Sequence, residues 1–154
     1  MAVCFLETSA LVKRYVQETG TVWVGNLFTP AAGNLLCIAQ IAGVETVAAV
    51  TLRARRGATT PGDAATALTS FRLDFARDFY RVPVDLTTIS RAMDLAEGHG
   101  LRGYDAVQLA TALQLEVQAV RTGLGRLVFI SADAHLNAAA AAEGLAVDDP
   151  NAHP

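Results

Sequence analysis

The chain opens with an uninterrupted apolar run that ends at an acidic residue. The stretch from Val3 to Leu6 contains no polar position and is followed by Glu7, two hydroxyl residues and the start of a helical pattern. Apolar runs without polar alternation are typical of strands buried on both faces of a parallel sheet. In open parallel sheets, ligands bind outside the carboxyl ends of the strands. The pattern therefore predicts a parallel α/β fold with Glu7 at its binding edge.

Strand-like runs and helical patterns alternate along the rest of the chain. The further strand-like runs are residues 35–39, 80–84, 126–130 and 145–147. This alternation predicts an α/β domain with a mainly parallel sheet of about five strands. With 154 residues the chain has room for one domain, which we expect over residues 1–148, followed by a frayed tail over residues 149–154.

Apolar residues at helical spacing predict which helix faces point inward. Between residues 41 and 56 the expected inward residues are Val44, Val47, Ala48 and Leu52. Phe71, Phe75 and Phe79 form a second stripe, which is most simply core, although such stripes also mark interfaces with another chain.

Charge and cysteine content bear on partners and compartment. The formal net charge is −3, from 12 basic and 15 acidic residues, and it excludes no class of partner. Cys4 and Cys37 lie in apolar runs and form no CxxC pair, which favours buried, reduced thiols and a cytoplasmic protein. No signal-peptide pattern and no bilayer-spanning apolar run is present, so membrane association is not expected.

Four acidic residues occupy positions that a parallel sheet would bring together. Glu7 and Asp133 each follow a buried strand. Glu45 lies in the first turns of the helix after the second strand, and Asp105 opens a long helix. Neighbouring carboxylates raise one another's pKa, a cost that a divalent cation offsets. Since Mg²⁺ and Mn²⁺ prefer oxygen ligands, the four acids predict a site for one of these ions.

A simpler, structural interpretation suits two of the four acids better than the other two. Asp105 and Asp133 suit helix N-termini, where capping and the helix dipole favour acidic residues. Glu45 is harder to explain in this way because its neighbours are mostly apolar, and Glu7 is enclosed between a strand and a helix. Taken together, the four acids favour a metal site.

Four segments form a recognisable pattern when they are taken in order. They are residues 5–13 (FLETSALVK), Glu45 in its helix, residues 103–112 (GYDAVQLATA) and residues 129–133 (FISAD). In order and placement they resemble the PIN-domain ribonucleases, especially the VapC-type toxins of bacterial toxin–antitoxin pairs. The resemblance implies a three-layer α/β/α domain that cleaves RNA with Mg²⁺ or Mn²⁺. It also implies a homodimer and a VapB-type antitoxin whose C-terminal segment covers the active site.

The resemblance also assigns roles to single residues. The acidic positions of the family, which bind metal and act in catalysis, fall on Glu7, Glu45, Asp105 and Asp133, and Ser9 matches a hydroxyl that orients the cluster. The family usually has aspartate where this chain has Glu7. The extra methylene moves the carboxylate by up to about 1.5 Å, and Mg²⁺ tolerates little distortion of its octahedral shell. A catalytically weakened PIN-like module that binds RNA or protein is therefore the alternative hypothesis.

The expected reaction is in-line attack of metal-activated water on an RNA phosphodiester. Asp105 and Glu7 are the expected main ligands, while Glu45 and Asp133 would bind a second ion or hold waters.

Three cations are candidate phosphate contacts: Arg102, Lys13 and Arg14. For Arg14 a solvated helix surface is the simpler interpretation. A receiver-like signalling domain also gathers acids around Mg²⁺, but it would be expected to have a lysine at the end of a late strand. Lys13 is the only lysine in the chain, which counts against that alternative.

Overall fold

Five parallel strands form the central sheet in the computed structural model, which describes residues 1–154. The strands are β1 Val3–Leu6, β2 Leu35–Ala39, β3 Tyr80–Val82, β4 Leu127–Ile130 and β5 Ala146–Asp148, in the order β3-β2-β1-β4-β5. All four pairings are parallel. β1 lies in the centre with all of its residues buried, as its apolar run predicts. The predicted α/β class with a parallel, five-stranded sheet is confirmed.

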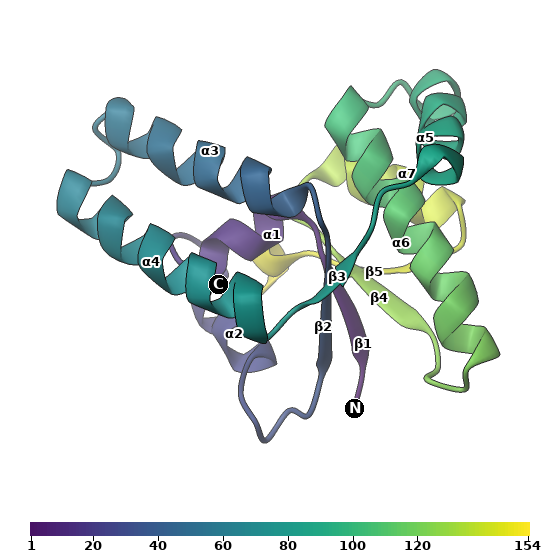
Figure 1. Cartoon of the computed structure of the whole chain (residues 1–154), viewed down its shortest axis with the longest axis horizontal. Helices are drawn as coiled ribbons and strands as arrows, with labels where there is room; N and C mark the ends of the chain where they lie inside the picture. Colours follow the sequence, from purple (N-terminus) through teal and green to yellow (C-terminus); the bar gives the residue numbers. More distant parts are fainter.

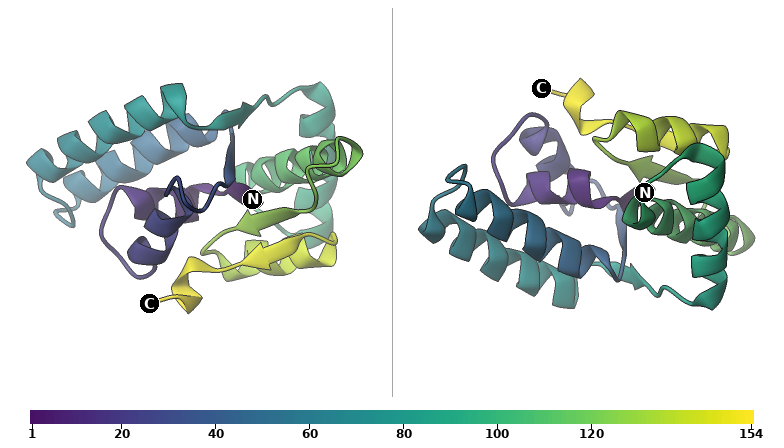
Figure 2. Two further views of the ribbon diagram at one scale, coloured as in Figure 1. Left: turned by 90° about the horizontal axis from the view of Figure 1, so that it is seen from below. Right: turned by 90° about the horizontal axis from the view of Figure 1, so that it is seen from above.

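Helices cover both faces of the sheet and make the three expected layers (Figures 1 and 2). One side holds α1 Thr8–Leu11, α2 Thr21–Leu27, α3 Ala42–Arg55 and α4 Pro61–Arg77. The other side holds α5 Leu86–His99, α6 Gly103–Arg121 and α7 Ala134–Ala142. Short 3-10 helices follow α1 at Val12–Arg14 and β5 at Pro150–Ala152. None of the helices combines the length and apolar character that crossing a bilayer requires.

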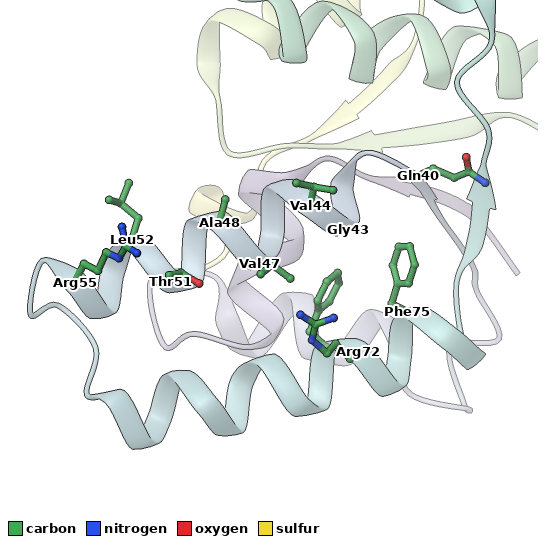
Figure 3. Close-up of a pocket in the computed structure, with 11 residues that line it drawn as sticks. Gln40, Gly43, Val44, Val47, Ala48, Thr51, Leu52, Arg55, Arg72 and Phe75 are labelled. Carbon is green, nitrogen blue, oxygen red and sulfur yellow. The ribbon is translucent and has the colours of Figure 1, made fainter.

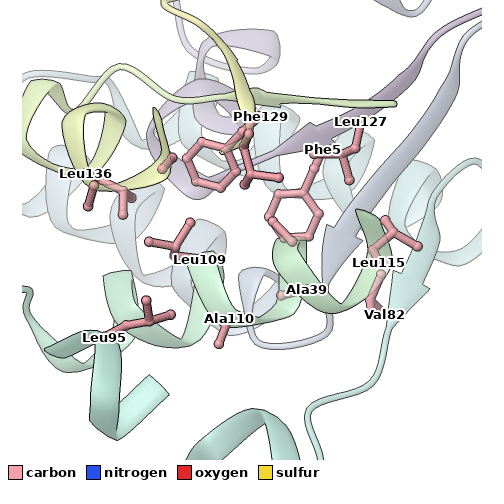
Figure 4. Close-up of a cluster of buried hydrophobic side chains, with 14 of the residues drawn as sticks. Phe5, Ala39, Val82, Leu95, Leu109, Ala110, Leu115, Leu127, Phe129 and Leu136 are labelled. Atoms are coloured by element: carbon pink, nitrogen blue, oxygen red, sulfur yellow. The ribbon is translucent and has the colours of Figure 1, made fainter. Parts of the chain in front are cut away.

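The two faces of β1 belong to two separate apolar cores because successive side chains of a strand point to opposite faces. Phe5 stacks on Phe129 of β4 with ring centroids 5.7 Å apart, and both rings pack toward Leu109 of α6 (Figure 4). Cys4 and Leu6 point the other way, toward the layer formed by α1 to α4. The sheet is therefore fixed from both sides.

The buried face of α3 differs from the expectation. Val44 is 76% exposed and Leu52 is 45% exposed, whereas Ala42, Thr46 and Val50 are buried. Apolar residues occur on several sides of this helix, so their spacing does not select one face. The exposed residues instead line a surface cavity.

Residues 149–154 lie against the domain, in contrast to the expected frayed tail. The Lys13 ammonium, which is buried, donates hydrogen bonds to Thr19 O at 2.9 Å and to Asn151 Oδ1 at 3.0 Å. The Trp23 ring stacks on His153 with centroids 4.3 Å apart. Gly20, at φ +84°, faces Pro150 so closely that a Cβ would collide with its carbonyl. A buried ammonium needs such partners, and the C-terminal segment supplies one.

Candidate active site

Glu7 lies at the carboxyl end of the central strand and is only 4% exposed. It is the N-cap of α1, and its Oε2 accepts hydrogen bonds from the Ser9 backbone N–H at 2.9 Å and from the Ser9 hydroxyl. Ser9 Oγ in turn accepts a hydrogen bond from Ala132 N at 2.9 Å. Ser9 therefore ties the Glu7 carboxylate to the loop that follows β4.

The electrostatic environment of Glu7 is unfavourable for a carboxylate. Burial raises the pKa of Glu7 to about 7, although the hydrogen bonds from Ser9 oppose the shift. Repulsion from Asp105 and Glu45 is a smaller contribution to the same rise in pKa. The three carboxylates thus lie within one another's field, although they are far apart in the sequence.

A buried amide holds Glu45. The Gln108 side chain donates from Nε2 to Glu45 Oε1 and to Thr8 Oγ1, both at 2.9 Å. Gln108 Oε1 is buried without a hydrogen-bond partner. Burial and the charge of Asp105 raise the pKa of Glu45, while the Gln108 hydrogen bond opposes that shift. Sequence reasoning missed Gln108, although a glutamine on the buried side of α6, three residues after Asp105, is a usable signal.

Arg102 forms ion pairs with the other two acids, Asp105 and Asp133. Its guanidinium Nε lies 2.9 Å from Asp105 Oδ2, and its Nη2 lies 3.4 Å from Asp133 Oδ2. The Arg102 side chain is 81% exposed. Asp133 also caps α7 by accepting a hydrogen bond from Leu136 N at 3.0 Å. The capping interpretation therefore holds for Asp133, and the same carboxylate also faces the acidic cluster through Arg102.

The other two candidate cations have different surroundings. Lys13 is 4% exposed, and its ammonium is engaged by Thr19 and by Asn151 of the C-terminal segment. Arg14 is exposed and lies over the Phe28 ring, 4.9 Å from its centroid. Of the three cations, Arg102 is the one that the fold brings to the acids.

The donor chemistry of the cluster fits a hard divalent ion. The negatively charged atoms of the cluster are all carboxylate oxygens, which are ligands that such ions prefer. The side-chain oxygen of Gln108 is also buried and accepts no hydrogen bond. No three His, Cys, Asp or Glu side chains, however, are grouped so that they could hold one ion together. An ion at this edge would therefore bind one or two protein carboxylates and complete its shell with water, as Mg²⁺ commonly does.

Two surface cavities lie beside α3. One, of about 690 Å³, is lined by Glu45 of α3, by residues of α5 and by the start of α6, including Asp105. The other, of about 800 Å³, lies between α3 and α4 and contains none of the four acids. Figure 3 shows Arg72 and Phe75 of α4 in the cavity between α3 and α4, together with Val47 of α3.

Comparison with known proteins identifies one family. The family model described as the PIN domain matches residues 4–140. No curated protein matches the chain.

Solved structures with the same fold include three from different organisms. PAE2754 from Pyrobaculum aerophilum is 18% identical, with a TM-score of 0.64 over 98% of this chain and 85% of that one. VapC20 from Mycobacterium tuberculosis, described as a sarcin-ricin loop cleaving toxin, is 16% identical, with a TM-score of 0.60 over 98% and 99%. VapBC2 from Rickettsia felis, bound to a promoter DNA fragment, is 12% identical, with a TM-score of 0.60 over 96% and 98%.

Proposed function

The chain belongs to the PIN domain family, and on that premise we propose that it is an endoribonuclease that requires Mg²⁺ or Mn²⁺. One observation carries the proposal. Glu7 is buried at the carboxyl end of β1, the Gln108 amide bonds both Glu45 and Thr8, the neighbour of Glu7, and Glu45 and Asp105 line one cavity. A cluster of carboxylates with so little compensating charge is suited to a divalent cation and to hydrolysis of a phosphodiester.

The four acids of the cluster would have different roles. Glu7 and Asp105 would be the main ligands of the ion, and Glu45 and Asp133 would bind a second ion or hold waters. When bound, the ion supplies a water of lowered pKa and a counter-charge for the leaving oxygen of the RNA.

Three further residues would support this site. Ser9 and Gln108 orient the carboxylates of Glu7 and Glu45 through the hydrogen bonds described above. Arg102, held at the surface by two carboxylates, would contact a phosphate of the substrate.

The biological role that we propose is that of the toxin in a toxin–antitoxin pair. The similar fold of VapC20, described as a toxin, and of the VapBC2 complex supports this role. It implies a VapB-type antitoxin as partner, and we propose a homodimer on the same basis. Both cysteines are buried and unpaired, which supports the cytoplasm as the compartment.

The decisive experiment is cleavage of defined single-stranded RNAs in EDTA, Mg²⁺ or Mn²⁺ by the natural chain and by Asp105→Asn. We expect cleavage only with a divalent ion, and a loss of about 100-fold or more in Asp105→Asn. Asp94→Asn is the matched control, because Asp94 is an exposed acid on α5 outside the cluster. It should cleave like the natural chain.

Two outcomes would overturn the proposal: no divalent-dependent cleavage, or equal cleavage by Asp105→Asn. RNA binding without cleavage would instead support the binding-module alternative. In that case a Glu7→Asp variant tests why cleavage is absent. Cleavage gained by this change alone would mean that the longer glutamate side chain misplaces the carboxylate.

A further inference from the structure

The cavity beside the acidic cluster has a chemically mixed lining. Glu45 and Asp105 contribute its carboxylates, and the rest of the lining is mostly apolar, including Ile89, Ala92 and Met93 of α5. Its volume of about 690 Å³ is within the range of pockets that enclose small ligands. A ligand here would place a flat or apolar part against α5 and a reactive part at the carboxylates.

The lining includes an aromatic side chain with no place in the core. Tyr104, at the start of α6, is 65% exposed, and Met93 of α5, which also lines the cavity, is 63% exposed. Nucleobases that are splayed out of a single strand stack on aromatic side chains, and such stacking tolerates any base because every base has a π-face. Methionine is flexible and polarizable, so it can adapt to such a ring.

Charge also selects the kind of ligand. Arg102 is the one basic residue that lines the cavity, and its side chain stays 81% exposed while it pairs with Asp105 and Asp133. A purely apolar ligand makes no use of the exposed part of this guanidinium, whereas a nucleotide presents a base to Tyr104 and a phosphate to Arg102.

We propose that this cavity binds one unstacked nucleobase of a single-stranded RNA, with Tyr104 stacked on the base and Arg102 contacting an adjoining phosphate. The proposal rests on the nuclease function and adds to it the part of the substrate that is bound beside the reacting bond. It makes Tyr104 and Met93 substrate-binding residues outside the acidic cluster.

The first test is the affinity for a fluorescein-labelled single-stranded RNA, measured by anisotropy in EDTA. Tyr104→Ala should bind about 10-fold more weakly because one stacking contact is lost, whereas Tyr104→Phe should bind like the natural chain. Tyr80→Ala is the matched control, since Tyr80 is 49% exposed but lies at the amino end of β3. It should change the affinity less than 2-fold. Met93→Ala is a second cavity variant and should weaken binding several-fold.

A series of RNAs with one abasic position each provides the second test. At the position whose base enters the cavity, removal of the base should weaken binding to the natural chain by about the factor seen for Tyr104→Ala. The same removal should add no further loss in Tyr104→Ala, because both changes delete one contact.

The outcomes separate this inference from the nuclease function. If RNA is cleaved but Tyr104→Ala and Met93→Ala bind it normally, the nucleobase site is refuted and the nuclease remains. If no RNA is cleaved but binding depends on Tyr104 and on one base, the nuclease is refuted and the site remains. A change of oligomeric state in Tyr104→Ala, with unchanged RNA affinity, would refute the site and identify this face as an interface between copies.

Discussion

The two cavities beside α3 are similar in size but opposite in charge. The cavity between α3 and α4, of about 800 Å³, is lined by Arg55 and Arg72 and by no acid. The cavity toward α5 and α6, of about 690 Å³, is lined by Glu45, Asp105 and Arg102. Adjacent residues of one helix thus serve two surfaces: Val44 lines the first cavity and Glu45 lines the second.

On the proposed function, neither volume nor apolar character would identify the active site in this fold. The cavity toward α5 and α6 contains Glu45 and Asp105, and the charges of these two acids contribute to the raised pKa of Glu7 at the carboxyl end of the central strand. Loops and helix starts converge at that edge in a parallel sheet, so polar groups from distant segments meet there. The cavity between α3 and α4 has an apolar surface for an interaction, but it lacks the carboxylates that the proposed hydrolysis of RNA needs.

The largest effect that we expect separates the two cavities by activity. Glu45→Gln keeps the size of the side chain and removes its charge, and it should lower RNA cleavage by about 100-fold or more. Arg55→Gln, on the same helix but in the other cavity, should stay within 2-fold. Initial rates with one defined RNA measure both. Similar losses of cleavage in the two variants would mean that the RNA contacts both cavities, and the functional distinction between the two cavities would then be wrong.

The second prediction concerns stability. The buried Glu7 carboxyl group should lower the free energy of unfolding at neutral pH. The pKa of Glu7 is about 7 in the folded chain, against an ordinary value of 4.5. Between these values the unfolded chain has released the proton and the folded chain still holds it. The free energy of unfolding should therefore fall by up to about 3 kcal/mol as the pH rises from 4.5 to 7, and should not fall further above pH 7 on account of this group.

Urea unfolding at a series of pH values tests this dependence. Glu7→Gln should flatten the fall and be more stable than the natural chain at pH 8 by about 3 kcal/mol. Glu97→Gln, an exposed glutamate on α5, is the control and should leave the curve unchanged. A Glu7→Gln curve that still falls by the same amount would assign the dependence to other groups.

Sequence patterns located the strands and the acids because both depend on local signals. A strand buried on both faces must be an apolar run, and β1, β2 and β4 are such runs. The acids were found because Glu7 and Asp133 directly follow strands and Asp105 opens a helix. Glu45 was found because it lies in the first turns of the helix after the second strand, among mostly apolar neighbours.

Contacts between distant segments could not be predicted in this way. Gln108 bonds Glu45 across 63 positions, and Lys13 bonds Asn151 across 138. Lys13 was a candidate phosphate contact because it is a cation on the first helix, yet the fold encloses it. The exposed position of Val44 was missed because α3 is apolar on several sides, so its packing against α4, α1 and β2 decides which side is covered.

The third prediction tests the α4 side by stability. Phe71 is 2% exposed and packs edge-on against Tyr15, with ring centroids 5.3 Å apart. Phe71→Leu should lower the free energy of unfolding by about 1 kcal/mol and leave RNA cleavage within 2-fold. Chemical denaturation and the cleavage assay together measure this. A large loss of cleavage at unchanged stability would connect this side to the active site and weaken the contrast between the cavities.

The smallest expected effect distinguishes the arginines of the two sides. Arg102 is 81% exposed in its pairs with Asp105 and Asp133, so Arg102→Gln should change the free energy of unfolding by less than about 1 kcal/mol. If Arg102 contacts an RNA phosphate, its loss should also reduce the slope of log affinity against log salt concentration by about 0.7. Arg72→Gln, in the cavity between α3 and α4, should leave that slope unchanged. Anisotropy titrations at several salt concentrations give both slopes. Equal reductions would mean that RNA follows positive charge on either side of α3, and a reduction for Arg72 alone would move the RNA path to α4.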